Sequence, residues 1–240
     1  MIIRRAGTQL HFITQPDHAR LARTVMEAYR PLSTNPRRAQ ILHAIGEHDN
    51  GWAEPDASPL VDPSAGSPVD FVSAPLAVRH GVWPRGVQRL AHDPWAAALV
   101  AQHALTVYDR YASDPRWTPF FARMASLRDE MLRSSGDDPT ALAGDYAFVR
   151  LGDLISLAFC TGWTDALRFA GWTVTRTGTH VEVTTVASVP AVSPEAFGGV
   201  IAIAVQAREL RQGPYRDDAE LQREFARAKV VELKGTVSGT

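Results

Sequence analysis

Cysteine is nearly absent from this sequence, since Cys160 is the only one in 240 residues. A single thiol cannot form a disulfide within the chain, and it cannot supply the ligands of a structural zinc site built on thiolates. We expect Cys160 to be a small core residue. The chain is long enough to bury a substantial core without a disulfide. These properties suit a reducing cytoplasm, where we expect the protein to be located.

The sequence also lacks an excess of charge of either sign and any long hydrophobic run. Lys and Arg total 25 against 26 for Asp and Glu, so the formal net charge is -1. Without a basic run, nucleic acid and anionic membranes are not expected partners. No segment reaches the roughly 18 apolar residues of a membrane-spanning helix, and no apolar secretion signal follows Met1 to Arg5. We therefore expect a protein that is neither exported nor inserted in a membrane.

Helical periodicity dominates the first two thirds of the sequence. Asp93-Pro94 and Asp138-Pro139 are typical helix starts. Apolar residues recur at helical spacing in residues 16–29, 39–45, 94–111, 120–132 and 139–159. This pattern predicts a mainly α fold with a helical bundle at its centre.

Strand-like alternation is confined to the two ends of the chain. Short strands are predicted at residues 2–4, 9–13, 172–176, 180–184 and 200–205, with a hairpin turn at Thr177-Gly178-Thr179. An amphipathic helix is expected over 217–228, and residues 236–240 are expected to fray. We predict an α+β arrangement in which a small β-sheet is an appendage of the helices. Its expected parts are a helical metal-binding domain over 1–165, with the N-terminal strands, and a strand-and-helix subdomain over 166–240 packed on it.

Four histidines and Asp153 interrupt apolar helix faces, and Asp49 directly follows one of these histidines where its helix ends. Asp153 is the most telling, because a carboxylate stands where a leucine would pack, between Val149 and Leu157. A buried carboxylate is costly unless it finds a proton, a cation or a metal. The full set is His18, His48, Asp49, His80, His103 and Asp153. These ligands suit one or two borderline divalent ions, with Asp49 able to bridge two of them.

The remaining histidines are expected to be surface or packing residues. They are His11, His43, His92 and His180, which lie off these helix faces or in strands and turns.

The order of these residues resembles that of the HD-domain superfamily of metalloproteins. Four segments are more specifically similar to an uncharacterised bacterial family, the DUF3891 proteins: Gln15-Pro16-Asp17-His18, His48-Asp49-Asn50-Gly51-Trp52, Pro68-Val69-Asp70-Phe71 and Gly152-Asp153-Leu154-Ile155-Ser156-Leu157. The resemblance implies an HD-like helical bundle. It also implies that His18, His48, Asp49 and Asp153 are core metal ligands, and that His80 and His103 are the extra ligands of dinuclear members.

One departure from the HD pattern concerns lysine. Many HD proteins place a Lys shortly after the His-Asp motif, whereas Gly51-Trp52 follows it here. The only lysines, Lys229 and Lys234, lie near the C-terminal end. No lysine of the helical part is therefore available to the site.

A metal-dependent hydrolase acting on a small phosphoester or phosphoanhydride is the leading functional hypothesis. Water activated by one or two divalent ions (Fe, Mn, Ni, Co or Zn) would be the nucleophile, and Asp49 would bridge the ions or orient the water. Arg79 and Arg85 are candidates for binding an anionic substrate, and Trp52 for touching it. A dinuclear iron oxygenase with a similar six-ligand set is the alternative, favoured by Trp52 and the scarcity of Lys. A non-catalytic metal- or ligand-binding protein is a third possibility.

A proline-rich segment, residues 51–73, begins directly after His48-Asp49. A long loop in a compact domain is often functional. We expect this segment to form part of the wall of the metal cavity, with Trp52 or Phe71 folded over the opening.

Overall fold

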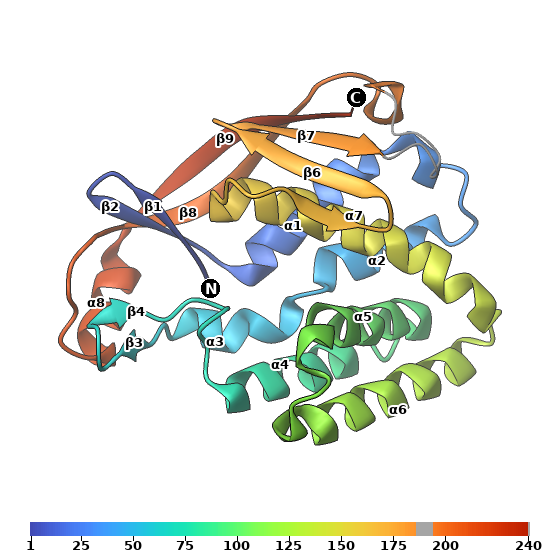
Figure 1. The fold of residues 1–240 in the computed structure, drawn as a ribbon, viewed down its shortest axis with the longest axis horizontal. Coiled ribbons are helices and arrows are strands. Elements are labelled where there is room, and N and C mark those ends of the chain that lie inside the picture. Colours follow the sequence, from blue (N-terminus) through green and yellow to red (C-terminus); the bar gives the residue numbers. More distant parts are fainter. Residues whose placement is uncertain (186–193, 240) are drawn as a thin grey trace.

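The computed structural model describes residues 1–185 and 194–239. A sheet covers one side of a group of helices, and α1 and α7 lie between this sheet and the other bundle helices (Figure 1). The helices are α1 (Gln15–Glu27), α2 (Arg38–Glu47), α3 (Ala53–Ala57), α4 (Leu76–Arg89), α5 (Pro94–Val107), α6 (Thr118–Ser135), α7 (Leu142–Thr161) and α8 (Asp218–Arg227).

Both ends of the chain contribute to the seven-stranded sheet, whose order is β1-β2-β8-β9-β7-β6-β5. Its strands are β1 (Ile2–Ala6), β2 (Gln9–Ile13), β5 (Leu167–Phe169), β6 (Trp172–Thr177), β7 (His180–Thr185), β8 (Ile201–Arg211) and β9 (Lys229–Gly239). Neighbouring strands are antiparallel except for β7 and β9, which are parallel. A separate two-stranded sheet joins β3 (Val61–Asp62) to β4 (Ser67–Pro68).

The fold is α+β, but the sheet is larger than the predicted appendage. The predicted hairpin at Thr177-Gly178-Thr179 is confirmed as β6–β7, and the two predicted N-terminal strands pair as β1–β2. The prediction that residues 236–240 fray is wrong for residues 236–239, because Thr236 pairs with both His180 and Ala202. The expected boundary at residue 165 falls between α7 and β5, and strands from both sides of it belong to the same sheet.

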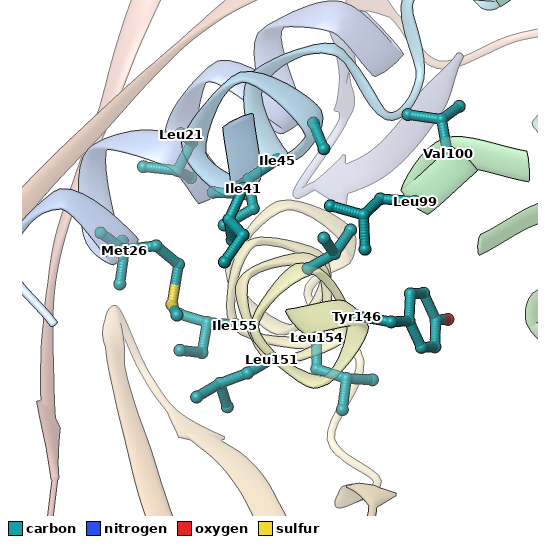
Figure 2. Close-up of a cluster of buried hydrophobic side chains, with 14 of the residues drawn as sticks. Leu21, Met26, Ile41, Ile45, Leu99, Val100, Tyr146, Leu151, Leu154 and Ile155 are labelled. Atoms are coloured by element: carbon teal, nitrogen blue, oxygen red, sulfur yellow. The ribbon is translucent and has the colours of Figure 1, made fainter. Parts of the chain in front are cut away.

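Helix α7 is the centre of the core. Figure 2 shows side chains of α1, α2 and α5 gathered around it. Gly152 allows α1 and α2 to approach α7 closely, since a Cβ there would lie 2.9 Å from Met26 Cγ of α1 and 3.3 Å from Ile45 Cγ2 of α2. Three helices therefore meet next to Asp153.

Side-chain caps set where two of these helices begin. Thr14 accepts a 3.1 Å hydrogen bond from the Asp17 backbone N–H at the start of α1. Asp93 caps α5 through the Ala96 N–H at 3.3 Å, as the Asp-Pro pair predicts.

Among the described residues, no helix combines the length and the apolar character needed to cross a bilayer.

Candidate metal centre

Two histidines face each other at the junction of α1 and α2. His18 lies in α1, and His48 follows the last residue of α2. Their Nε2 atoms are 3.1 Å apart, and both side chains are fully buried. At this separation only one of the two nitrogens can carry a proton, because two N–H groups would point at each other. One of the two nitrogens must therefore present its lone pair, either to the N–H of the other ring or to a cation.

Two carboxylates surround this histidine pair. The Oδ2 atom of Asp49 lies 3.5 Å from the Nε2 atoms of both His18 and His48. From α7, the Oδ1 atom of Asp153 lies 3.1 Å from His18 Nε2 and 3.5 Å from His48 Nε2. Oxygen and nitrogen atoms that could bind a metal thus converge from three segments, which are α1, the end of α2 and α7.

His103 of α5 extends the cluster on the other side of Asp153. Its Nε2 atom is 3.7 Å from Asp153 Oδ2, and its ring centroid is 5.0 Å from that of His48. Two groups of candidate ligands result: His18, His48 and Asp49, and His48, His103 and Asp153. Within each group the ligand atoms lie within 4.8 Å of one another. We call these five residues the His–Asp cluster.

Hydrogen bonds behind the rings orient two of the histidines. His48 Nδ1 donates to the Ile45 carbonyl at 2.7 Å. Because a carbonyl oxygen can only accept, the neutral ring keeps its proton on Nδ1 and its lone pair on Nε2. His103 Nδ1 lies 3.2 Å from the Tyr146 hydroxyl. Metal-ligating histidines are typically held in this way.

The electrostatics of the cluster favour a cation. Burial alone would lower the pKa of His48, but Asp49 and Asp153 outweigh it and raise this pKa to about 9. Burial raises the pKa of Asp49. The pKa of Asp153 is well below its usual range, because Arg150, His18 and His48 together outweigh burial. A divalent ion could replace the His48 proton, and imidazole and carboxylate donors are those such ions accept.

A cavity of about 370 Å³ lies against the cluster. Asp49, His103 and Asp153 line it, together with Arg79, Arg110 and Arg150 and a group of apolar and aromatic side chains. Trp52 and Phe71 are both among these, so the expectation that residues 51–73 form part of the wall is confirmed. The segment is not a plain loop, because it contains a 3-10 turn, η2 (Asn50–Trp52), as well as α3, β3 and β4.

Comparison with protein families gives one match. The model of a family of proteins of unknown function, DUF3891, matches residues 1–212. The chain belongs to the DUF3891 family. Comparison with curated proteins and with solved structures finds no match. In this DUF3891 protein the matched region contains the whole His–Asp cluster and the arginines of the cavity, whereas α8 and β9 lie beyond it.

Two candidate residues of the DUF3891 protein lie away from the cluster. His80 packs between Trp117 and Phe120, with ring centroids 4.6 and 5.1 Å away, and it belongs to neither ligand group. The inward face of α4 carries Val82, Trp83, Gly86 and Val87, and His80 stands at its edge. Arg85 donates to the Gly51 carbonyl at 2.7 Å and pairs with Glu54 at 3.2 Å. The cavity lining does not include it.

Other residues at the site were not predicted. Arg150 makes an ion pair with Asp153, and Arg110 lines the cavity. Arg150 precedes Asp153 by nearly one helical turn, and this spacing is a signal that the sequence does contain. Arg110 and Trp163 follow the ends of helices, where periodicity gives no information about side-chain direction.

Proposed function

We propose that this DUF3891 protein binds a divalent metal ion at the His–Asp cluster and hydrolyses a small phosphoester or phosphoanhydride there. The observation that carries the proposal is the combination of buried ligands and arginines in one cavity. Within the described chain, neither Arg79 nor Arg110 has a carboxylate at ion-pairing distance, and both line the cavity. Arginines without an acidic partner suit a compact anion such as a phosphoryl group.

Each part of the site has a role in this proposal. The His–Asp cluster holds the metal, with His18, His48, Asp49 and Asp153 as the ligands that the HD-domain resemblance implies and His103 as a further ligand. An HD-like helical arrangement is part of the proposal. A bound divalent ion would supply a water of lowered pKa as nucleophile. Asp49 reaches both the cluster and the cavity, so it can orient that water. Arg79 and Arg110 bind the phosphoryl oxygens and neutralise charge that develops on them.

Metal content is the first test. Protein purified without added metal is examined by elemental analysis and visible absorbance. We expect His48→Ala and Asp153→Ala to lose stoichiometric metal while far-ultraviolet circular dichroism shows most of the helical content retained. His80→Ala is the matched control and keeps its metal, because His80 lies outside both ligand groups. Full retention of metal in either cluster variant would contradict the site.

Turnover is the second test. The metal-loaded protein is assayed with p-nitrophenyl phosphate, bis(p-nitrophenyl) phosphate and pyrophosphate. We expect phosphate release from at least one of them, and loss of that activity in Asp49→Asn. Two irons per chain, with visible absorbance and oxygen consumption but no phosphate release, would instead favour the dinuclear iron oxygenase.

A further inference from the structure

Aromatic side chains form much of the cavity wall beside the His–Asp cluster. They are Trp52, Phe71, Trp83, Tyr108 and Trp163, which come from the segment 51–73, from α4 and from the residues that follow α5 and α7. The wall begins at the cluster, since the Trp83 ring lies 5.6 Å from that of His103. Tyr108 then stands edge-on to Trp83 at 6.0 Å. A ligand bound next to the metal ligands would therefore contact aromatic surfaces.

The opening of the cavity also presents aromatic surface. Phe71 and Trp163 stack there, with ring centroids 6.1 Å apart and planes 30° apart. Trp163 remains 42% exposed and its neighbour in the lining, Val72, 39% exposed. Exposed apolar side chains next to a cavity are a feature of ligand-binding grooves.

The backbone holds Trp163 at this opening. The left-handed Gly162 (φ +72°) ends α7 directly before it. The Trp163 N–H donates to Thr161 Oγ1 at 3.2 Å, and its carbonyl accepts from Arg176 Nε at 3.3 Å. The backbone N–H and the carbonyl of Trp163 are thus both held by hydrogen bonds.

Five residues of the cavity wall have a buried polar side-chain atom without a hydrogen-bond partner among the described residues: Gln15, Trp52, Arg79, Trp83 and Arg150. Two of these atoms, the indole N–H of Trp52 and the Oε1 atom of Gln15, belong to side chains without charge in residues that are 3% exposed. A buried donor or acceptor without a hydrogen bond is unfavourable. Such atoms are explained when a ligand supplies the missing groups.

We propose that the cavity selects phosphoesters whose alcohol part carries a planar ring. The proposal rests on the hydrolase function above and names its substrate class. The cavity volume of about 370 Å³ is near the low end of the range of about 300–1,000 Å³ for small-molecule sites, which suits one ring system and a phosphate. In the reaction, the water oxygen forms the new bond to phosphorus, the bond from phosphorus to the ester oxygen breaks, and a proton passes to the released ring-bearing alcohol.

The test separates ring recognition from turnover. Binding of phenyl phosphate and of cyclohexyl phosphate to the protein as purified is measured by isothermal titration calorimetry. The two esters match in charge and in ring size, and only phenyl phosphate has a planar aromatic face. We expect phenyl phosphate to bind about tenfold more tightly, because stacking adds to the shared phosphate contacts.

Variants assign that preference to the cavity. Trp163→Leu is expected to abolish the difference between the esters, because it removes the aromatic face of this lining residue and keeps an apolar side chain in its place. Val230→Ala, at an exposed position of β9, is the control and keeps the tenfold difference. Equal binding of the esters to the wild type, or an unchanged preference in Trp163→Leu, would overturn the ring proposal. If both esters bind equally and both are hydrolysed, the ring proposal is wrong and the hydrolase proposal is still supported. If phenyl phosphate is preferred but neither ester is hydrolysed, ring recognition is supported and the hydrolase proposal is contradicted.

Discussion

At the scale of single residues, the groups behind the candidate ligands matter as much as the ligands. The Ile45 carbonyl and the Tyr146 hydroxyl each bind the Nδ1 atom of a cluster histidine. Tyr146 is 4% exposed, and burial raises the pKa of its hydroxyl, so it stays protonated. Both groups leave the Nε2 atoms directed at the cluster.

Removing the Tyr146 hydroxyl alone is expected to weaken metal binding. Tyr146→Phe keeps the ring but leaves His103 Nδ1 without its partner, and loss of such a contact typically costs about 10–100-fold in metal affinity. Competition with a chromophoric chelator measures the change. Tyr29→Phe removes the hydroxyl of another buried tyrosine, one that contacts Phe148 and Phe197, and is expected to bind metal as the wild type does. Equal affinities in the two variants would show that Tyr146 does not orient His103.

Proton release should make metal binding depend on pH. The pKa of His48 is raised to about 9, so below that pH the metal-free protein carries a proton that the metal must displace. Apparent metal affinity is expected to rise by about tenfold per pH unit from pH 7 toward 9 and then to level off. Calorimetry in buffers of different ionisation enthalpy would report the released proton. An affinity independent of pH over this range would mean that metal binding does not displace a proton from His48.

At the scale of secondary-structure elements, the site depends on how closely neighbouring segments approach. Gly51 of η2 lies against α4, and a Cβ at this position would be 1.9 Å from the Val82 carbonyl oxygen. The Asn50 side chain also reaches α4, donating to the Gly86 carbonyl at 3.4 Å. These contacts hold the segment that carries Asp49 and Trp52.

A methyl group at Gly51 should therefore destabilise the folded protein. Gly51→Ala is expected to lower the free energy of unfolding by about 1–3 kcal/mol, because backbone must move to admit the new atom. Gly81→Ala is the matched control in α4, where a Cβ meets nothing within 4 Å, and it should be neutral or stabilising by up to about 1 kcal/mol. Urea denaturation of both variants gives the comparison. A Gly51→Ala protein as stable as the control would show that η2 can shift away from α4 at no cost.

Elements with strong periodicity were predicted well, and those set by tertiary contacts were not. Asp153 was identified as an inward residue of α7 because its apolar neighbours repeat through the helix. His80 follows a similar spacing, yet its ring packs against Trp117 and Phe120. The direction of the His80 side chain depends on how α4 packs against its neighbours, which the sequence pattern does not show. Strand β9 was missed because the exposed Val230 breaks its alternation and Gly235 lies within it, so the alternating run is short.

At the scale of the whole molecule, the sheet ties the two ends of the chain together. Strands β1 and β2 precede the helical bundle, and β2 finds its partner in β8, which follows the bundle (Figure 1). Buried residues of the sheet, such as Val174 and Val205, belong to the same hydrophobic core as Val25 of α1 and Val149 of α7. The helices and the sheet share one core.

Residues 1–165 expressed alone are therefore not expected to form a stable domain. Without residues 166–240, β2 loses its pairing with β8, and the sides of α1 and α7 that pack against the sheet become exposed. Limited proteolysis and thermal denaturation followed by circular dichroism should show a poorly protected fragment without a cooperative transition. A fragment that melts cooperatively and binds metal would establish residues 1–165 as an independent domain.

The pairing of Gln9 with Arg211 has a kinetic consequence. Contacts between residues so distant in sequence require a large loop to close, and chains dominated by them fold slowly. During translation β1 and β2 leave the ribosome long before β8, and β9 follows later still. Throughout that interval the nascent hairpin exposes an unpaired strand edge that other chains can join. We expect the protein's yield in cells to be sensitive to the rate of synthesis and to chaperones that shield such edges.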